Sequence, residues 1–146
     1  MQPLLQLRLP MLAAFAMAAA CTPAQTDGID PQGKAFDKVA PQEAVTMLGT
    51  EPFWNLAVTG KTARYSNPDH PEGHEFPVER FAGNGGLSFT GSLAGAPVTA
   101  TLTPGQCSDG MSDRTFPFVA TIALGGETLR GCGYTDSQPF TGPEAP

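Results

Sequence analysis

Residues 107–117 carry the densest set of reactive and hydrogen-bonding side chains that we identify in this 146-residue chain. A cysteine, two Ser-Asp steps, a glycine and an arginine follow one another closely, and we call the segment the clamp. Asp109 and Asp113 are expected to cap turns by accepting hydrogen bonds from nearby backbone N–H groups, with Gly110 in a left-handed conformation. The clamp is therefore predicted to be an ordered loop rather than a strand.

Arg114 in the clamp requires a carboxylate partner if it is buried, because charges leave water only when they are paired. We expect Glu51 to be that partner, since it lies with Trp54 in the second polar and aromatic block, residues 49–54. An ion pair that stabilises the fold is the first interpretation, and a charged pair facing a ligand is the alternative. Trp54 is interpreted first as a core aromatic residue and second as a ligand platform. The candidate polar cluster comprises Glu51, Trp54, Asp109, Asp113 and Arg114.

His70 and His74 are the two histidines of the chain, and Asp69 and Glu72 lie beside them. A four-residue spacing places two imidazoles together on a helix, but Pro71 and a glycine at 73 oppose a helix here. We therefore predict a solvated loop over residues 67–73, with no metal and no cofactor.

Nucleophilic hydrolysis is not expected. No serine of the chain lies in a strand-turn-helix glycine motif, and both histidines share one segment far in sequence from Ser108 and Ser112. We predict a protein that is not an enzyme and has no catalytic residue.

Residues 1–20 are typical of an export signal. Arg8 is followed by an apolar stretch, and three alanines precede Cys21. Small residues ending at a cysteine resemble the lipobox of bacterial lipoproteins, which implies lipid transfer to the Cys21 thiol, cleavage before it and acylation of the new amino terminus. Thr22 follows where an aspartate would favour the inner membrane, so the same resemblance implies an outer-membrane anchor facing the periplasm. Ordinary cleavage and secretion to the periplasm is the alternative.

Lipidation of Cys21 leaves Cys107 and Cys132 as an even pair in an oxidising compartment, which predicts one disulfide. The glycines at 125 and 126 suit a two-residue hairpin turn, which pairs Ile122 with Leu129 and Val119 with Cys132. Cys132 then lies on the face opposite the apolar one. Either the disulfide lies outside the core or a bulge at Gly131 turns Cys132 inward, and we favour the bulge.

Charge limits the class of partner. All 14 acidic residues follow Ala20, against seven of the eight basic ones, so residues 21–146 have a formal charge of −7. No basic footprint for nucleic acid is present. Solubility is the simplest interpretation, and a cationic protein is the partner class that this charge favours.

After residue 49 apolar residues alternate with polar ones, with turn residues between the runs. The fold class is therefore mainly β, a small antiparallel barrel or sandwich of about seven or eight strands, with the closed barrel preferred because it leaves no exposed edge. Residues 41–49 are expected to form one short N-terminal helix. The predicted divisions are the signal peptide at 1–20, the lipid anchor and flexible tether at 21–40, the β-domain at 41–134 and a disordered tail at 135–146.

Three blocks resemble a family of uncharacterised bacterial lipoproteins: GTEPFW at 49–54, CSDGMSDR followed by FP at 107–117, and LRGC at 129–132. The resemblance covers about residues 49–133. It implies a periplasm-facing domain in the style of META-domain lipoproteins and membrane-bound lysozyme inhibitors, and it transfers no catalytic residue.

These observations predict a non-enzymatic envelope lipoprotein whose β-domain binds a partner in the periplasm or at the outer membrane. An inhibitor of a cationic hydrolase such as lysozyme is one alternative. A lipoprotein that binds a small ligand or responds to metal stress is another.

Overall fold

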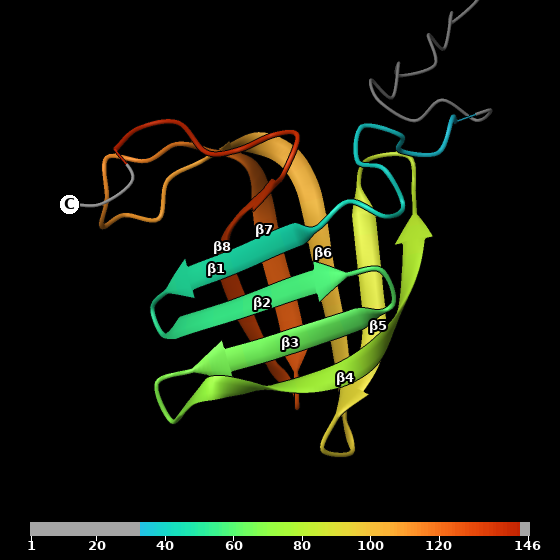
Figure 1. Ribbon diagram of the computed structural model, residues 1–146, viewed down its shortest axis with the longest axis vertical. Coiled ribbons are helices and arrows are strands. Elements are labelled where there is room, and N and C mark those ends of the chain that lie inside the picture. Colours follow the sequence, from blue (N-terminus) through green and yellow to red (C-terminus); the bar gives the residue numbers. More distant parts are fainter. Residues whose placement is uncertain (1–32, 144–146) are drawn as a thin grey trace, which may run out of the picture.

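The computed structural model describes residues 33–143 and forms one closed barrel of antiparallel strands (Figure 1). Each strand pairs with the next along the chain, and β1 pairs with β8 to close the barrel. The fold class, the strand number and the preferred closed barrel are confirmed. The strands are β1 (Val45–Thr50), β2 (Phe53–Thr59), β3 (Thr62–Asn67), β4 (His70–Ala82), β5 (Leu87–Leu93), β6 (Ala96–Cys107), β7 (Phe116–Leu124) and β8 (Glu127–Thr135).

Alternation along each strand produces the core, since successive side chains of a strand point to opposite faces. In β7, for example, Phe118, Ala120 and Ile122 are buried inside the barrel while Val119 faces out. Large and small inward residues are mixed because the interior is narrow. A Cβ at Gly133 would come within 2.3 Å of Leu102 Cδ1, so the core has no space for a side chain there.

The longest strand, β4, belongs to both halves of the barrel. Its residues up to Pro77 pair with β3, and from Val78 it pairs with β5. Figure 1 shows β4 bending from the layer of β1, β2 and β3 toward β5. This strand therefore carries the barrel around its corner, and its first residues extend into the β3–β4 hairpin.

The prediction of a helix at residues 41–49 is wrong. Residues 41–43 form a turn and the chain enters β1 at Val45, which pairs with β2 on one side and β8 on the other. A nine-residue helix is marginal in water. Pairing along both edges supplies the backbone hydrogen bonds that such a helix would have made, and it also buries Val45 and Met47.

The last part of the predicted tether is packed against the barrel. Phe36 and Val39 are buried, and the Phe36 N–H donates a 2.7 Å hydrogen bond to the Gly83 oxygen. The Phe36 ring meets Phe118 edge to face, with 6.5 Å between centroids. The flexible-tether prediction is therefore wrong for residues 33–40. The predicted signal peptide, Cys21 and the rest of the tether lie outside the described residues.

The expected loose tail also packs on the domain. Thr141 and Thr115 exchange two backbone hydrogen bonds of 2.9 Å, and the Phe140 ring lies against Phe116 and Tyr134, with centroids 5.5 and 5.3 Å away. These aromatic contacts order the segment despite its turn residues. The tail prediction is therefore wrong for residues 135–143, while residues 144–146 lie outside the described part.

The predicted disulfide joins Cys107 to Cys132, with their Cα atoms 5.6 Å apart. The predicted hairpin register is confirmed, and it runs without a shift through Gly131. The favoured bulge at Gly131 is therefore wrong, and the register shift lies in β6, between Pro104 and Cys107. Cys132 shares the outer face of the barrel with its cross-strand partner Val119, so the disulfide lies outside the core.

Candidate binding groove

Asp109 organises the clamp, as its residue type predicted. Its Oδ1 accepts hydrogen bonds from the backbone N–H groups of Met111 and Ser112, at 3.0 and 2.8 Å, and its Oδ2 accepts one from the Ser112 hydroxyl at 2.8 Å. Burial raises the pKa of Asp109, but the hydrogen bonds from Ser112 and Met111 outweigh it and hold this pKa below its ordinary value. Gly110 adopts the expected left-handed conformation, with φ of 73°.

Arg114 does not pair with Glu51 within residues 33–143. Its guanidinium carbon lies 4.5 Å above the centre of the Phe140 ring, and its Nε donates a 2.8 Å hydrogen bond to the Pro143 oxygen. The expected ion pair is therefore wrong. The ordered C-terminal segment offers Arg114 an aromatic face and a carbonyl oxygen, so no carboxylate partner is needed.

The remaining two members of the predicted cluster, Trp54 and Asp113, lie in different environments. Trp54 is buried in the core, where its Nε1 has no hydrogen-bond partner in the described part of the chain. It packs so closely on Gly49 that a Cβ there would come within 2.1 Å of Nε1. Asp113 is exposed, and no hydrogen bond to its carboxylate is seen among residues 33–143. Trp54 is thus the core aromatic residue that we expected first.

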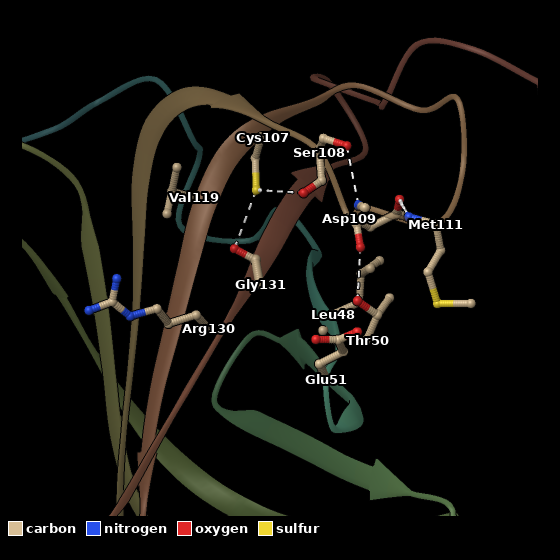
Figure 2. A pocket seen from close by; sticks show the side chains of 12 residues that line it. Leu48, Thr50, Glu51, Cys107, Ser108, Asp109, Met111, Val119, Arg130 and Gly131 are labelled. Carbon is tan, nitrogen blue, oxygen red and sulfur yellow. Dashed lines mark hydrogen bonds between the residues drawn. The ribbon is translucent and has the colours of Figure 1, made fainter.

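A groove of about 490 Å³ lies between the clamp and the outer faces of β1, β7 and β8 (Figure 2). Apolar side chains form part of its wall, and two of them are open to solvent, with Met111 67% and Val119 39% exposed. Phe53 is 52% exposed and pairs across the β1–β2 hairpin with Thr50, which lines the groove. The lining residues are Leu48, Gly49, Thr50, Glu51, Cys107, Ser108, Asp109, Gly110, Met111, Val119, Arg130 and Gly131.

The groove has a fixed backbone frame. The disulfide joins Cys107, at the start of the clamp, to Cys132 on β8, and Cys132 is only 1% exposed although it faces outward. On the other side, Thr50 Oγ1 donates a 2.8 Å hydrogen bond to the Asp109 oxygen, which joins the end of β1 to the clamp. Both walls are therefore held at their present separation.

Charged groups of opposite sign lie at different places in the groove. Figure 2 shows the Arg130 side chain extending away from Glu51 and Met111. The groove thus combines apolar contact area with two acidic residues, Glu51 and Asp109, and one basic residue, Arg130.

Two of the five predicted cluster residues, Glu51 and Asp109, line this groove. The prediction missed Val119, although the hairpin register had already paired it with Cys132. It also missed Arg130, which lies two residues before Cys132 on β8 and therefore on the same face of the strand. It also missed Met111, whose exposure depends on the conformation of the clamp. The hairpin register around Cys132 was therefore a better guide to the position of the groove than the polar residues of the predicted cluster.

A wider hollow of about 1160 Å³ lies over β4 and β5, and Lys61, Glu79 and Arg80 are among its lining residues. None of the large hydrophobic side chains that are exposed in the described part of the chain lines it. The Arg80 guanidinium already donates a 2.8 Å hydrogen bond to the Val39 oxygen. We therefore regard the groove at the clamp as the stronger candidate.

Comparison with protein-family models, curated proteins and solved structures found no match. Within residues 33–143 there is no helix with the length and apolar character needed to cross a bilayer.

Proposed function

We propose that this protein is a non-enzymatic lipoprotein of the cell envelope that binds another protein through the groove at the clamp. One observation carries the proposal. Exposed apolar side chains, Met111 and Val119 in the groove and Phe53 beside it, gather on a backbone that a disulfide holds in place.

A fixed frame favours binding because little backbone entropy is lost when the partner docks. Met111 adds a flexible apolar contact that can adapt to different partner side chains. Burying such a side chain contributes roughly 1.5–3 kcal/mol, enough for a few residues to dominate an interface.

The partner class follows from charge. Residues 21–146 have a formal charge of −7, and Glu51 lines the groove. A basic protein with an exposed apolar side chain therefore complements the surface both at long range and on contact.

The proposed location rests on residues 1–21. An export signal over residues 1–20, directly before Cys21, supports lipid attachment to that cysteine, with the domain facing the periplasm from the outer membrane. A disulfide between the other two cysteines is consistent with an oxidising compartment.

The hydroxyl groups of the clamp support a structural rather than a nucleophilic role. Ser108 Oγ accepts a 3.2 Å hydrogen bond from the Gly110 N–H, and the Ser112 hydroxyl donates to Asp109. No hydrogen bond within residues 33–143 joins either serine to a histidine, and both histidines lie on β4.

Crosslinking at Met111 tests the proposal. A photoreactive amino acid replaces Met111 in cells, and the matched control carries it at Phe81, which is 68% exposed and does not line the groove. We expect a protein adduct from position 111 that is missing from position 81. The captured protein, once purified, should bind the wild type at least about tenfold more tightly than Met111→Asp, which is a difference of about 1.4 kcal/mol, while Phe81→Asp should match the wild type. Equal adducts at both positions, or no adduct at 111, would contradict the proposal.

An inhibitor of a cationic hydrolase is the special case in which the captured partner is an enzyme. The acidic charge favours it, and lysozyme is the convenient probe. Unchanged lysozyme activity with a large excess of the purified protein excludes lysozyme as the partner and leaves the groove to other basic proteins.

A further inference from the structure

Three metal-ligating side chains come together on the first residues of β4. Donor atoms of His70, Glu72 and His74 all lie within 4.8 Å of one another. The two imidazole rings have their centroids 4.8 Å apart, and His70 Nδ1 lies 3.8 Å from Glu72 Oε1. All three side chains are exposed, so an ion can reach them directly from solvent.

A regular strand cannot produce this arrangement. Residues four apart in an extended strand have Cα atoms about 13 Å apart, too far for two imidazoles to share one ion. Here the pairing of β3 with β4 shifts between Tyr65 and Asn67. Residues 71–73 of β4 face the single residue 66 of β3 across that shift, which forms a bulge and shortens the path between the two histidines.

The sequence of the bulge explains why it forms. Gly73 has a φ of 75°, a left-handed conformation that glycine adopts without strain. Pro71 lacks an N–H group, so it leaves no ladder hydrogen bond unmade at an irregular position. Asn67 Oδ1 accepts a 2.9 Å hydrogen bond from the His70 N–H and fixes the start of the strand. The residues that led us to expect a solvated loop therefore form a bulge inside the hairpin, and the loop prediction is wrong from residue 70 onward.

We propose that His70, Glu72 and His74 bind one divalent first-row transition-metal ion, such as Zn²⁺ or Cu²⁺. Two imidazoles and one carboxylate are donors that these ions accept together. Three protein ligands leave at least one position for water or for a group from a partner. The site uses no residue of the groove, so it stands or fails separately from the proposed binding function.

The geometry requires only side-chain adjustment. Zn²⁺ binds nitrogen and oxygen donors at about 2.0–2.2 Å, which places the donors of a tetrahedral site about 3.3–3.5 Å apart. The observed separations reach 4.8 Å. All three side chains are exposed, so rotation about their side-chain bonds is the adjustment that the site would require on binding the ion.

Zinc titration of the full chain tests the site. The protein is purified in detergent with Cys21→Ser, so that this thiol does not compete, and with an affinity tag that lacks histidine. The chain contains two histidines, so any imidazole that binds the ion belongs to His70 or His74. Calorimetry should show one Zn²⁺ per chain. The melting temperature should rise with Zn²⁺, because an ion that binds only the native state stabilises it.

Four variants separate a site from general surface binding. Mutation of a residue that only hydrogen-bonds to a metal ligand lowers metal affinity by about 10- to 100-fold. Loss of a ligand itself should cost at least as much, so His70→Gln and His74→Gln should each weaken Zn²⁺ binding by at least about tenfold. Glu72→Gln removes one negative charge from the cluster, and the matched control Asp69→Asn removes one beside it. We expect weaker binding in Glu72→Gln and wild-type binding in Asp69→Asn. Equal losses in these two variants would show attraction by charge alone and overturn the proposal.

Two further results would also overturn it. One is a double variant, His70→Gln with His74→Gln, that binds Zn²⁺ as tightly as the wild type. The other is a wild-type protein whose melting temperature does not change with Zn²⁺. All these side chains are exposed, so the variants should melt like the wild type without metal, which separates lost binding from lost folding.

Discussion

The Ser137 N–H donates a 2.9 Å hydrogen bond to Glu43 Oε1, joining two residues that lie 94 positions apart in the chain. The Ser137 hydroxyl donates to the same oxygen, and Glu43 Oε2 accepts a 3.1 Å hydrogen bond from the Ala40 N–H. Glu43 precedes β1 and Ser137 follows β8, the two strands that close the barrel. This carboxylate therefore connects the two ends of the closed sheet.

Acid should weaken this connection. Hydrogen bonds from the side chains of Ser137 and Thr135 lower the pKa of Glu43 from 4.5 to about 2, against the opposing effect of burial. Because the folded pKa is the lower one, Glu43 stabilises the fold fully above pH 4.5, and this contribution is lost as the pH falls toward about 2. Urea unfolding of the wild type and Glu43→Gln should show a gap in free energy at pH 7 that narrows between pH 4.5 and 2. A gap that stays constant would contradict the prediction, and Glu79→Gln serves as the control for removing an acid elsewhere.

The disulfide should contribute a large part of the stability. Cys107 and Cys132 are separated by 25 residues, and closing a loop of that length stabilises a fold by about 3–4 kcal/mol in the chain-entropy model. We expect the double variant Cys107→Ala with Cys132→Ala, in a Cys21→Ser background, to lose about that much free energy of unfolding. Urea titration measures the difference.

Thiol reactivity gives an independent check on the same bond. Cys132 is 1% exposed, so after reduction its thiol should react with an alkylating reagent much more slowly than that of the half-buried Cys107. A reduced protein in which both thiols react quickly, yet which melts at the temperature of the oxidised form, would show that the disulfide does not stabilise the domain.

The strands were predictable because period-two alternation is a local signal. Residues 118, 120 and 122 alternate in sequence as they do in the barrel, and the glycines at 125 and 126 set a register that pairs Cys132 with Val119 as expected. The segment at 41–49 was not predictable in this way. Its proline and glycine fit a helix locally, and only pairing with β2 and β8 makes it a strand.

The sites were harder to predict because they depend on contacts between distant segments. Arg114 was assigned a carboxylate since nothing in the sequence places Phe140 beneath it. No metal site was predicted at His70 and His74, because a spacing of four aligns two imidazoles on a helix and the proline and glycine between them oppose one. The bulge brings His70 and His74 together because β4 has three residues opposite one residue of β3. This difference depends on how the two strands pair, so it cannot be read from the sequence of β4 alone.

Gly131 should tolerate no side chain. A Cβ there would come within 1.9 Å of the Leu48 oxygen, a backbone atom of a paired strand that cannot move aside. We expect Gly131→Ala to lower the free energy of unfolding by about 3 kcal/mol, at the upper end of the usual cost of overpacking. Gly85→Ala is the matched control, because no atom lies within 4 Å of its added Cβ. Equal stability of the two variants by urea titration would show that the strands around Gly131 can separate.

Phe36 should stabilise the barrel although it lies outside the strands. It is 8% exposed and packs edge to face on Phe118, whereas Phe81 is 68% exposed on the outer surface. Phe36→Ala should lower the free energy of unfolding by about 3–5 kcal/mol, because it removes a buried aromatic ring and leaves a cavity. Phe81→Ala removes the same atoms from water and should change the stability by less than about 0.5 kcal/mol. Thermal and urea unfolding of the pair checks this, and equal stabilities would show that residues 33–40 form the tether that their composition suggested.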